Sequence, residues 1–561
     1  MKYASLLVLI LLSILPSTGY TQSLKVYRKS LGPQSYQTAK IQGLTVKDAI
    51  GDAYHQFVYD GASENLFIND IDSILCVIEE EQMSDVTLGD YMLLCLSDEK
   101  SGYHIFSKLI AATGLIDTLS LIKDELYEKL YSEGQIDATP QHRYYGYTLF
   151  AEQDSFWEKE LKKDVSSITI EDIQNYLIQS GKYSSTSVNN DYQDSENVVF
   201  QFVAYHVLPV KLSPYQLVIH ANEYGFDLQR PGQLSIPVMD YYSTMDNRHI
   251  LKLYESAESN GVFLNRFPQL DNSWTGTGHE ISCEPDFAGI RVLENQVVQG
   301  LANGFLYPID GLLTYDESIK QQLGSTMLRF DIASLLPELM NNGIRRKCSL
   351  DEEDQVVHFP STPVYPYFEN MQTNADANVV YHNFYKNEIT TYQGDLLTCT
   401  GMYDVTIVLP PVPVTGQYQL RMGTHLTKKG TVYQTYFGDN HTYLPAKGIP
   451  MDNRIWPDYS EQRGWREDTF DEEHDLQVEK SLHNQGLYKG PKSISCKEYG
   501  SARNNPNCLR RILTRELMEA DHTYYLRLRC VIELLEDELW LDYIELCPLS
   551  IYSGNELEDV W

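Results

Sequence analysis

The stretch YTLFAEQDSFWEKEL, residues 147–161, changes its hydrophobic period from that of a strand to that of a helix. Tyr147 to Phe150 is a short β-prone run, which predicts a strand. Asp154 then stands where an N-cap would be, ahead of apolar side chains at helical spacing. These side chains are Phe156, Trp157 and Leu161. A strand followed at once by an amphipathic helix predicts a mixed α and β domain around this stretch.

The sequence on both sides continues the mixed pattern. Apolar residues recur at helical spacing over residues 92–110, and Gly114 then serves as a C-terminal cap. A capping-box pattern at residues 169–172 opens another helix, which Gly181 can end. Residues 305–313 read as strand, turn and strand. Helices and strands therefore alternate irregularly through the first half of the chain, as in α+β domains.

The pattern changes near residue 380, after which strands dominate. Apolar and polar side chains alternate over residues 403–409, 417–422 and 526–534, and residues 540–546 read as a final strand. Alternation with one polar face is typical of antiparallel sheets, most simply of a β-sandwich. The predicted fold class is therefore multidomain α+β, an α+β domain followed by an antiparallel β-sandwich.

The chain of 561 residues carries 78 acidic and 44 basic side chains, a formal net charge of -34. This charge repels a phosphate backbone, so we expect no nucleic acid among the partners. It equally disfavours anionic membrane surfaces, and its simplest interpretation is solubility. With 42% hydrophobic residues the chain can bury sizeable cores, which excludes a globally disordered protein.

Residues 1–22 have the pattern of a secretory signal peptide, in which Lys2 precedes an apolar run and small residues follow it. No apolar run reaches the roughly 20 residues that a membrane helix needs, so we expect no direct membrane insertion. The first cysteine is Cys76, so no cysteine is available for lipidation at the cleavage site. The prediction is a secreted protein of the periplasm or the cell surface.

Export permits disulfides, but nine cysteines leave at least one thiol unpaired within a monomer. Cys496 and Cys508 share a loop-like segment and could pair. Cys95 and Cys530 lie in apolar patterns that are typical of buried residues. The sequence alone establishes no pairing.

Four motifs stand in order in the first half of the chain: FSKLIAATGL at 106–115, TLFA at 148–151, Tyr205-His206, and Asn303-Gly304 with IDGLL at 309–313. In this order they resemble a fasciclin domain spanning residues 86–318. The resemblance implies a compact α+β fold and a non-enzymatic adhesion or binding role at a cell surface. Two departures stand out: Glu152 replaces the proline usual after TLFA, and residues 210–285 contain an insertion.

The end of the chain carries a second resemblance. LDYIEL at 541–546, followed by Pro548, resembles the last strand of galactose-binding-like domains, which are jelly-roll β-sandwiches and occur widely as carbohydrate-binding modules. We place this domain at residues 381–555, with an N-terminal lead-in at 23–85 and a linker region at 319–380. The combination is similar to envelope proteins of Gram-negative gut-type bacteria, many of which bind or process glycans.

Aromatic side chains are the candidate ligand-binding residues, because aromatic rings stack on the apolar faces of sugars. Those of the predicted sandwich are Trp456, Tyr459, Trp465, Tyr433 and Tyr436. The alternative is that these rings are core residues. In the fasciclin-like part, Tyr205 and His206 either contribute to a partner-binding surface or are buried inside the fold.

Residues 472–483 hold the densest cluster of possible metal ligands, including His474 and Glu479. Their carboxylates could bind Ca²⁺, and a solvated charge run is the alternative, as it is for the acidic residues 351–354. No other cofactor is predicted. The catalytic motifs HExxH and GxSxG and a phosphate-binding loop are absent from the sequence, so we expect no enzyme.

The sequence therefore predicts a non-enzymatic adhesion or ligand-binding protein of the cell envelope, with a polysaccharide as the expected partner. The first alternative is a protein–protein adhesin or scaffold, which binds a cell-surface protein and in which the β-sandwich is structural. The second alternative is a glycan-active hydrolase.

Overall fold

The computed structural model describes most of the chain after residue 84, together with several strands before it. The described residues are 85–136, 140–184, 189–214, 217–218, 236–256, 258–345, 355–360, 365–383, 389–426, 429–454, 463–496, 498–532, 537–553 and 560–561, together with six strands within residues 21–79. Within them, helices and antiparallel sheets are mixed, which confirms the coarse prediction of an α+β protein.

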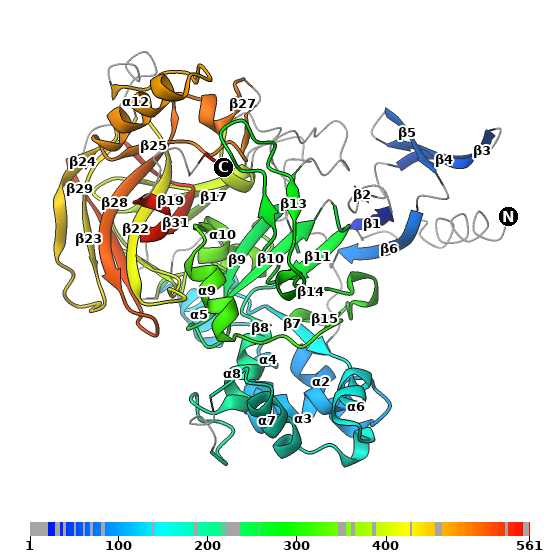
Figure 1. The fold of residues 1–561 in the computed structure, drawn as a ribbon. Coiled ribbons are helices and arrows are strands. Elements are labelled where there is room, and N and C mark those ends of the chain that lie inside the picture. The colour runs from blue at the N-terminus through cyan, green and yellow to red at the C-terminus, as the bar shows by residue number, and fades with distance from the viewer. Residues whose placement is uncertain are drawn as a thin grey trace.

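Six helices gather at one end of the molecule (Figure 1). They are α2 (Leu88–Ser97), α3 (His104–Ala112), α4 (Leu115–Leu119), α6 (Asp154–Leu161), α7 (Ile170–Gln179) and α8 (Val198–Tyr205). Their apolar faces share one core, in which Trp157 is fully buried. Capping boxes begin α2 at Thr87 and α7 at Thr169, the second as the sequence predicts.

Asp154 acts on a different helix from the one expected. Helix α6 begins at Asp154 itself, and Gln153 is its N-cap. The Asp154 carboxylate accepts hydrogen bonds from the backbone N–H groups of His104 and Ile105, at 3.0 and 2.8 Å. It therefore satisfies the first turn of α3, a contact between residues that lie about fifty positions apart, and the predicted N-cap role is wrong.

A small sheet joins the helices to the rest of the molecule. Strand β7 (Tyr147–Glu152) pairs in parallel with β15 (Gly304–Ile309) and antiparallel with β8 (Val207–Leu208). All residues of β7 are buried. The strand predicted from residue 147 is thus present, and it extends through Glu152.

The stretch predicted as an insertion, residues 210–285, supplies most of a four-stranded antiparallel sheet. Its order is β14 (Ile290–Arg291), β11 (Gly261–Leu264), β10 (Ile250–Ser256) and β9 (Val238–Ser243). Side chains of β9 and β10 share one hydrophobic core with the strands of the C-terminal half. The sheet is therefore an integral layer of the fold, and Figure 1 shows it above the helices and beside the C-terminal strands.

Three antiparallel sheets pack in the C-terminal half. The first has the order β16 (Leu328–Asp331), β31 (Tyr543–Pro548), β22 (Gly416–His425), β28 (Cys508–Met518), β25 (Leu487–Lys489). The second has the order β18 (Met371–Thr373), β21 (Asp404–Val408), β29 (Tyr525–Ile532), β23 (Val432–Gly438), β24 (Ala446–Asp452). The third has the order β17 (Gln355–Pro360), β19 (Asn378–Asn383), β20 (Asp395–Thr400), β30 (Glu538–Leu541).

Residues 319–380, predicted as a linker region, belong to these sheets. Strand β16 pairs with β31, β17 pairs with β19, and β18 pairs with β21. Between them, α10 (Ile332–Leu335) and α11 (Glu338–Asn341) contribute buried side chains to the common core. The linker prediction is therefore corrected: this stretch completes the edges of three sheets.

The N-terminal strands form two small antiparallel sheets. One consists of β2 (Gln34–Gln37), β1 (Thr21–Arg28) and β6 (Ile71–Glu79), and the other of β3 (Ile41–Ala49), β4 (Asp52–Tyr59) and β5 (Ala62–Phe67). In the part of the chain that the structure describes, no helix combines the length and apolar character needed to cross a membrane.

Candidate functional site

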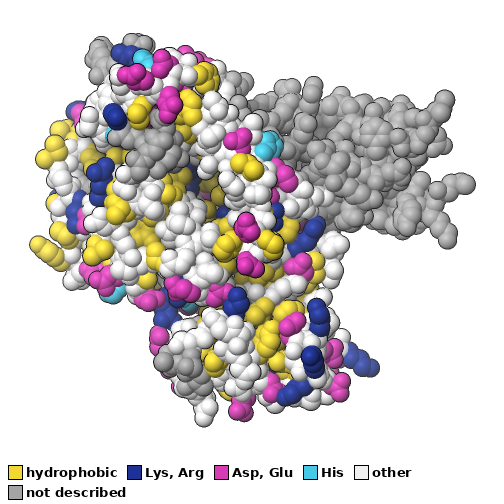
Figure 2. Space-filling model, viewed as in Figure 1, with side chains coloured by type: hydrophobic (Ala, Val, Ile, Leu, Met, Phe, Trp, Pro, Cys, Tyr) yellow, Lys and Arg dark blue, Asp and Glu magenta, His cyan; other side chains and the backbone are white. Residues whose placement is uncertain are grey.

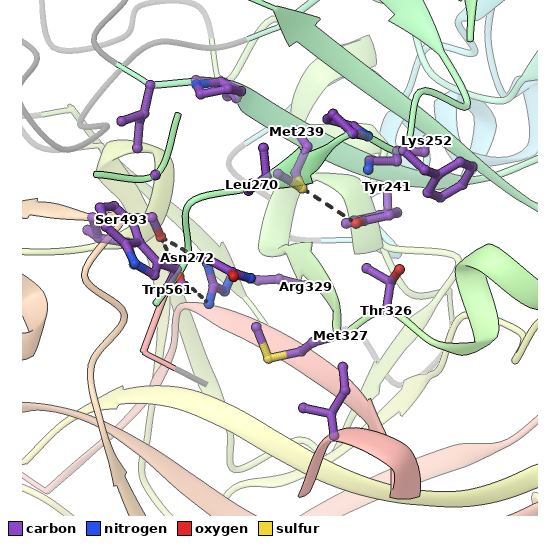
Figure 3. Close-up of a pocket in the computed structure, with 18 of the residues that line it drawn as sticks. Met239, Tyr241, Lys252, Leu270, Asn272, Thr326, Met327, Arg329, Ser493 and Trp561 are labelled. Atoms are coloured by element: carbon purple, nitrogen blue, oxygen red, sulfur yellow. Dashed lines mark hydrogen bonds between the residues drawn. The ribbon is translucent and has the colours of Figure 1, made fainter. Parts of the chain in front are cut away.

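A cavity of about 360 Å³ lies between β9 and β10 on one side and the β16 edge of the first C-terminal sheet on the other. Its lining residues come from stretches far apart in the sequence: 236–239, 241, 252, 267–268, 270, 272, 278, 322, 325–327, 329, 392–393, 493–494, 551 and 561. A volume of this size is in the range of small-ligand sites. The cavity is therefore the candidate site for this chain (Figure 3).

The walls of the cavity are mainly aromatic and aliphatic. They include Tyr241, Phe267, Tyr392 and Trp561, with Met239, Leu270, Met327 and Ile494. The Tyr392 hydroxyl donates to the Met239 carbonyl at 3.1 Å, and the Trp561 Nε1–H donates to the Ser273 carbonyl at 3.2 Å. These hydrogen bonds hold two rings in place, so the aromatic walls are pre-organised.

Gly278 allows the Trp561 ring to close one side. A Cβ atom at Gly278 would lie 2.7 Å from a ring carbon of Trp561, and the backbone φ there is +77°. Only glycine adopts such a φ without strain while leaving this space empty. The indole also lies beneath an ammonium group, because Lys492 Nζ is 4.6 Å from the ring centroid.

Arg329 on β16 brings a guanidinium group to the cavity. Its Nε donates to Glu545 at 2.9 Å, and its Nη atoms reach Ser493 Oγ at 3.4 Å and a main-chain oxygen of Trp561 at 3.5 Å. Glu545 also lies 3.8 Å from Arg421 and 3.6 Å from Arg510. Burial acts to raise the pKa of Glu545, but the three arginines outweigh it and hold this pKa below its usual value.

Lys252 on β10 is the second cationic residue of the lining. It is only 4% exposed, and its Nζ lies 4.6 Å from the Phe267 ring centroid and 5.0 Å from that of Tyr254. No residue in the described ranges accepts a hydrogen bond from Nζ or forms an ion pair with it. Burial lowers the pKa of Lys252 to about 7, although Cys283 and Glu280 act in the opposite direction.

Several buried carboxylates lie behind the cavity wall. Asp240 accepts hydrogen bonds from the lining residues Gln393 and Tyr392, at 3.1 and 3.4 Å. Burial, and then the charge of Asp331, raise the pKa of Asp240 to about 6. Arg345 forms ion pairs with Asp331 at 2.6 Å and with Asp395 at 3.0 Å. None of these acids is among the residues that line the cavity.

The aromatic residues predicted to bind a ligand are not gathered at one place. Trp456 and Tyr459 lie outside the described residues. Tyr433 is fully buried and its hydroxyl accepts from Asn453 Nδ2 at 3.3 Å, so its prediction as a surface residue is wrong. Trp465 is half-buried against the apolar cluster beside α12 (Glu472–His483), and Tyr436 is half-buried beneath Arg527. Tyr433 lies on β23 (Val432–Gly438), and its ring is on the face of that strand that packs in the core.

Tyr205 and His206 are both completely buried. The Tyr205 hydroxyl donates to the Ile250 carbonyl at 3.2 Å. His206 Nδ1 lies 2.6 Å from the Phe202 carbonyl and its Nε2 lies 3.1 Å from Glu152 Oε1. The partner-binding role is therefore corrected in favour of the structural alternative, because neither ring reaches the surface. Glu152, which stands where the resemblance to fasciclin domains leads one to expect proline, is the partner of the His206 ring.

The acidic cluster at 472–483 has local structural partners. Asp475 accepts from the backbone N–H of Thr469 at 2.9 Å, and Glu479 pairs with Arg503 at 2.6 Å. Among the described residues no group of three or more His, Cys, Asp or Glu side chains is arranged to hold a metal ion. On the face seen in Figure 2, acidic side chains are spread out rather than gathered. Ca²⁺ binding stays a prediction, and residues 351–354 are not described.

Cys496 and Cys508 are both unpaired thiols in the structure. They lie near each other, because Thr390 contacts both: its Oγ1 donates to Cys496 Sγ at 2.8 Å and its carbonyl lies 3.6 Å from Cys508 Sγ. Cys95 and Cys530 are buried, as their apolar surroundings predict.

Neither Lys252 nor Arg329 was predicted as a site residue. A signal for Lys252 exists in the sequence ILKLYES, where one lysine interrupts an apolar strand. All seven residues of this strand are buried, so the lysine has no route to bulk solvent along the strand. No comparable signal marks the remaining lining residues, because their contacts join distant segments.

No protein-family model and no curated protein matches the chain. Among solved structures, one match is a xanthan lyase from Paenibacillus, with 13% identity, 30% of this chain covered, 11% of that chain covered and a TM-score of 0.18. The chain thus spans about a tenth of that enzyme, and a likeness this slight carries no argument about fold or function.

Proposed function

We propose that this chain is a non-enzymatic glycan-binding protein of the cell envelope and that its ligand occupies the cavity between β9–β10 and β16. The observation that carries the proposal is the lining itself, in which aromatic rings stand beside hydroxyl, amide and cationic groups. Aromatic rings stack on the apolar faces of sugar rings, while the polar groups bond to sugar hydroxyls.

The shape of the site favours the end of a glycan chain. A cavity bounded by Trp561, Tyr241 and Arg329 surrounds its ligand on several sides, whereas the middle of a polysaccharide needs an open groove with two exits. We therefore expect binding of short oligosaccharides and chain ends.

We also propose a domain family for each half of the chain and a location for the protein. We infer a fasciclin-like first half, supported by the order of its four motifs, and a galactose-binding-like second half, supported by LDYIEL at 541–546 and by packed antiparallel sheets. Export to the periplasm or cell surface is supported by the signal-like residues 1–22.

The test is a glycan array probed with residues 23–561, with and without Ca²⁺. Ser325 is an exposed residue of the lining at the end of α9 (Glu317–Gly324), so Ser325→Trp should fill the entrance and abolish a hit. Ser97→Trp is the matched control, because Ser97 is an exposed serine at the end of α2. No hit with folded protein, or a hit that Ser325→Trp leaves intact, would refute the proposal.

One observation favours the alternative of a protein–protein adhesin. Leu93 and Leu94 on α2 are 45% and 62% exposed, and Leu121 after α4 is 46% exposed. Exposed leucines on one lobe are a feature of protein-binding surfaces when they are contiguous. If the array is blank, Leu94→Lys is the first variant to test, because it should abolish binding to a cell-surface protein without disturbing the core.

A further inference from the structure

We propose that the cavity selects a glycan end that carries one negative charge, either a uronic-acid carboxylate or a sulfate ester, and that Lys252 is the residue that recognises this charge. The inference rests on the proposed glycan-binding function and names the class of sugar. It is carried by the geometry around Lys252 and by the charges of the lining.

The charged side chains of the lining are both cationic. Lys252 and Arg329 line the cavity, and its lining includes no aspartate or glutamate. The chain as a whole has a net charge of -34, so a cavity lined this way runs against the overall composition. Chance placement of charged residues in such a chain would more often bring carboxylates to a cavity.

Arg329 is already engaged, and Lys252 is not. Arg329 is bonded to Glu545, a carboxylate that it shares with Arg421 and Arg510. Lys252 Nζ contacts two aromatic rings but, within the described residues, finds no acceptor and no carboxylate at ion-pair distance. A buried ammonium group without a counter-ion costs free energy, and an anionic ligand would supply that counter-ion.

The titratable groups that surround Lys252 do not replace such a ligand. Glu280 is paired with Arg266 at 2.7 Å, and burial raises the pKa of Cys283, which favours the neutral thiol. Tyr254 beside it on β10 is buried, and its pKa is raised far above the physiological range. Among the described residues, no negative charge is therefore paired with Lys252, and an anion in the cavity can accept a hydrogen bond from its Nζ.

The lining separates the charge from the stacking surface. In Figure 3, Lys252 and Trp561 lie on opposite sides of the view, with Tyr241 and Arg329 drawn between them. A ligand that stacks on Trp561 and places its acidic group near Lys252 must therefore extend across the cavity. One negative charge suffices, because Arg329 already has a carboxylate partner.

Three probes distinguish the possible ligands in calorimetric titrations of residues 23–561. They are uronic-acid oligosaccharides, their carboxyl-reduced neutral counterparts, and sulfated forms of those neutral counterparts. We expect an anionic form to bind about tenfold or more tightly than its neutral counterpart, as a charge-assisted hydrogen bond allows. The preferred anion identifies the source of the charge.

Lys252→Met keeps an unbranched apolar side chain at this position and removes the charge. It should weaken the anionic ligand about tenfold or more while leaving the affinity for the neutral counterpart within about twofold, and Lys252→Arg should restore part of the preference. Lys480→Met is the matched control, because Lys480 is exposed on α12 and outside the lining.

The outcomes separate this inference from the proposed function. If neutral and anionic oligosaccharides bind equally, or if Lys252→Met weakens both equally, the charge selection is refuted and glycan binding stands. If the folded protein binds no glycan on the array and none of the three probes, both fail together. If Lys252→Met still binds anionic oligosaccharides more tightly than neutral ones, another residue recognises the charge, and the role proposed for Lys252 is refuted.

Discussion

Replacing Lys252 with methionine should remove a pH dependence from the stability of the chain. In the folded protein the pKa of Lys252 is lowered to about 7, from 10.5 for an unperturbed lysine, chiefly because the side chain is buried. Between these two values the unfolded chain holds a proton that the folded chain has lost. The contribution of Lys252 to the free energy of unfolding must therefore rise with pH from about 7 to about 10.5.

The magnitude follows from the two pKa values. Each pH unit within the window contributes about 1.4 kcal/mol, so the interval from pH 7 to pH 9 contributes about 3 kcal/mol. Below pH 7 both states bind the proton and the penalty is constant at its largest value. Lys252→Met lacks this penalty at every pH, so its stability advantage over the natural chain should shrink by about 3 kcal/mol between pH 7 and pH 9.

Urea titration followed by brief proteolysis measures this difference at pH 6, 7, 8 and 9. Only the difference between variant and natural chain is interpreted, because tyrosines and carboxylates elsewhere titrate equally in both. Lys480→Met, at an exposed position, should show no pH-dependent difference. A Cys283→Ser background checks that this neighbouring thiol does not produce the effect. A constant difference for Lys252→Met from pH 6 to 9 would refute the argument that burial controls the charge of Lys252.

Three further substitutions test the fold and the cavity wall. Asp154→Ala removes both hydrogen bonds to the first turn of α3, and urea titration should show a loss of about 1–2 kcal/mol. Glu152→Ala leaves the buried His206 ring and the Leu313 N–H without their acceptor. We expect calorimetry to show that the free energy of unfolding falls by about 2–3 kcal/mol. A fall of less than about 1 kcal/mol would contradict this reasoning. Gly278→Ala strains the backbone at φ +77° and displaces Trp561; it should cost about 1 kcal/mol and weaken glycan binding.

Individual helices and strands could be predicted because the spacing of apolar side chains that indicates each of them is contained within a few consecutive residues. The helix after residue 154 and the strand after residue 147 follow from the spacing of apolar side chains, and both are present. The same spacing does not say which partner a side chain finds. Aspartate is a residue type that favours the N-cap, and Asp154 stands at the start of α6. Its carboxylate nevertheless accepts hydrogen bonds from the first turn of α3, because the two chain segments meet only in the folded molecule.

The candidate site could not be predicted for the same reason. Its lining joins β9, β10, the start of β16 and the last residue, Trp561, so no window of the sequence contains it. Aromatic content points to sugars but does not identify the rings that line the cavity: Tyr433, a predicted ligand-binding residue, is buried, while Tyr241 and Tyr392 line the cavity. The stretch 319–380, predicted as a linker region, contains β16, β17 and β18, each of which completes the edge of a sheet through pairing with a distant strand.

Buried ion pairs and hydrogen bonds near the cavity limit which substitutions can be used to test ligand binding. Arg329, Arg345 and Asp240 all have partners in buried ion pairs or hydrogen bonds. Removing one member of a buried pair leaves an uncompensated charge and typically costs about 3–5 kcal/mol, so such variants would lose binding through unfolding alone. Lys252 differs, because its Nζ holds no such bond within the described residues and its substitution by methionine should stabilise the fold at pH 7. It is therefore the charged lining position at which a loss of ligand affinity can be separated from a loss of structure.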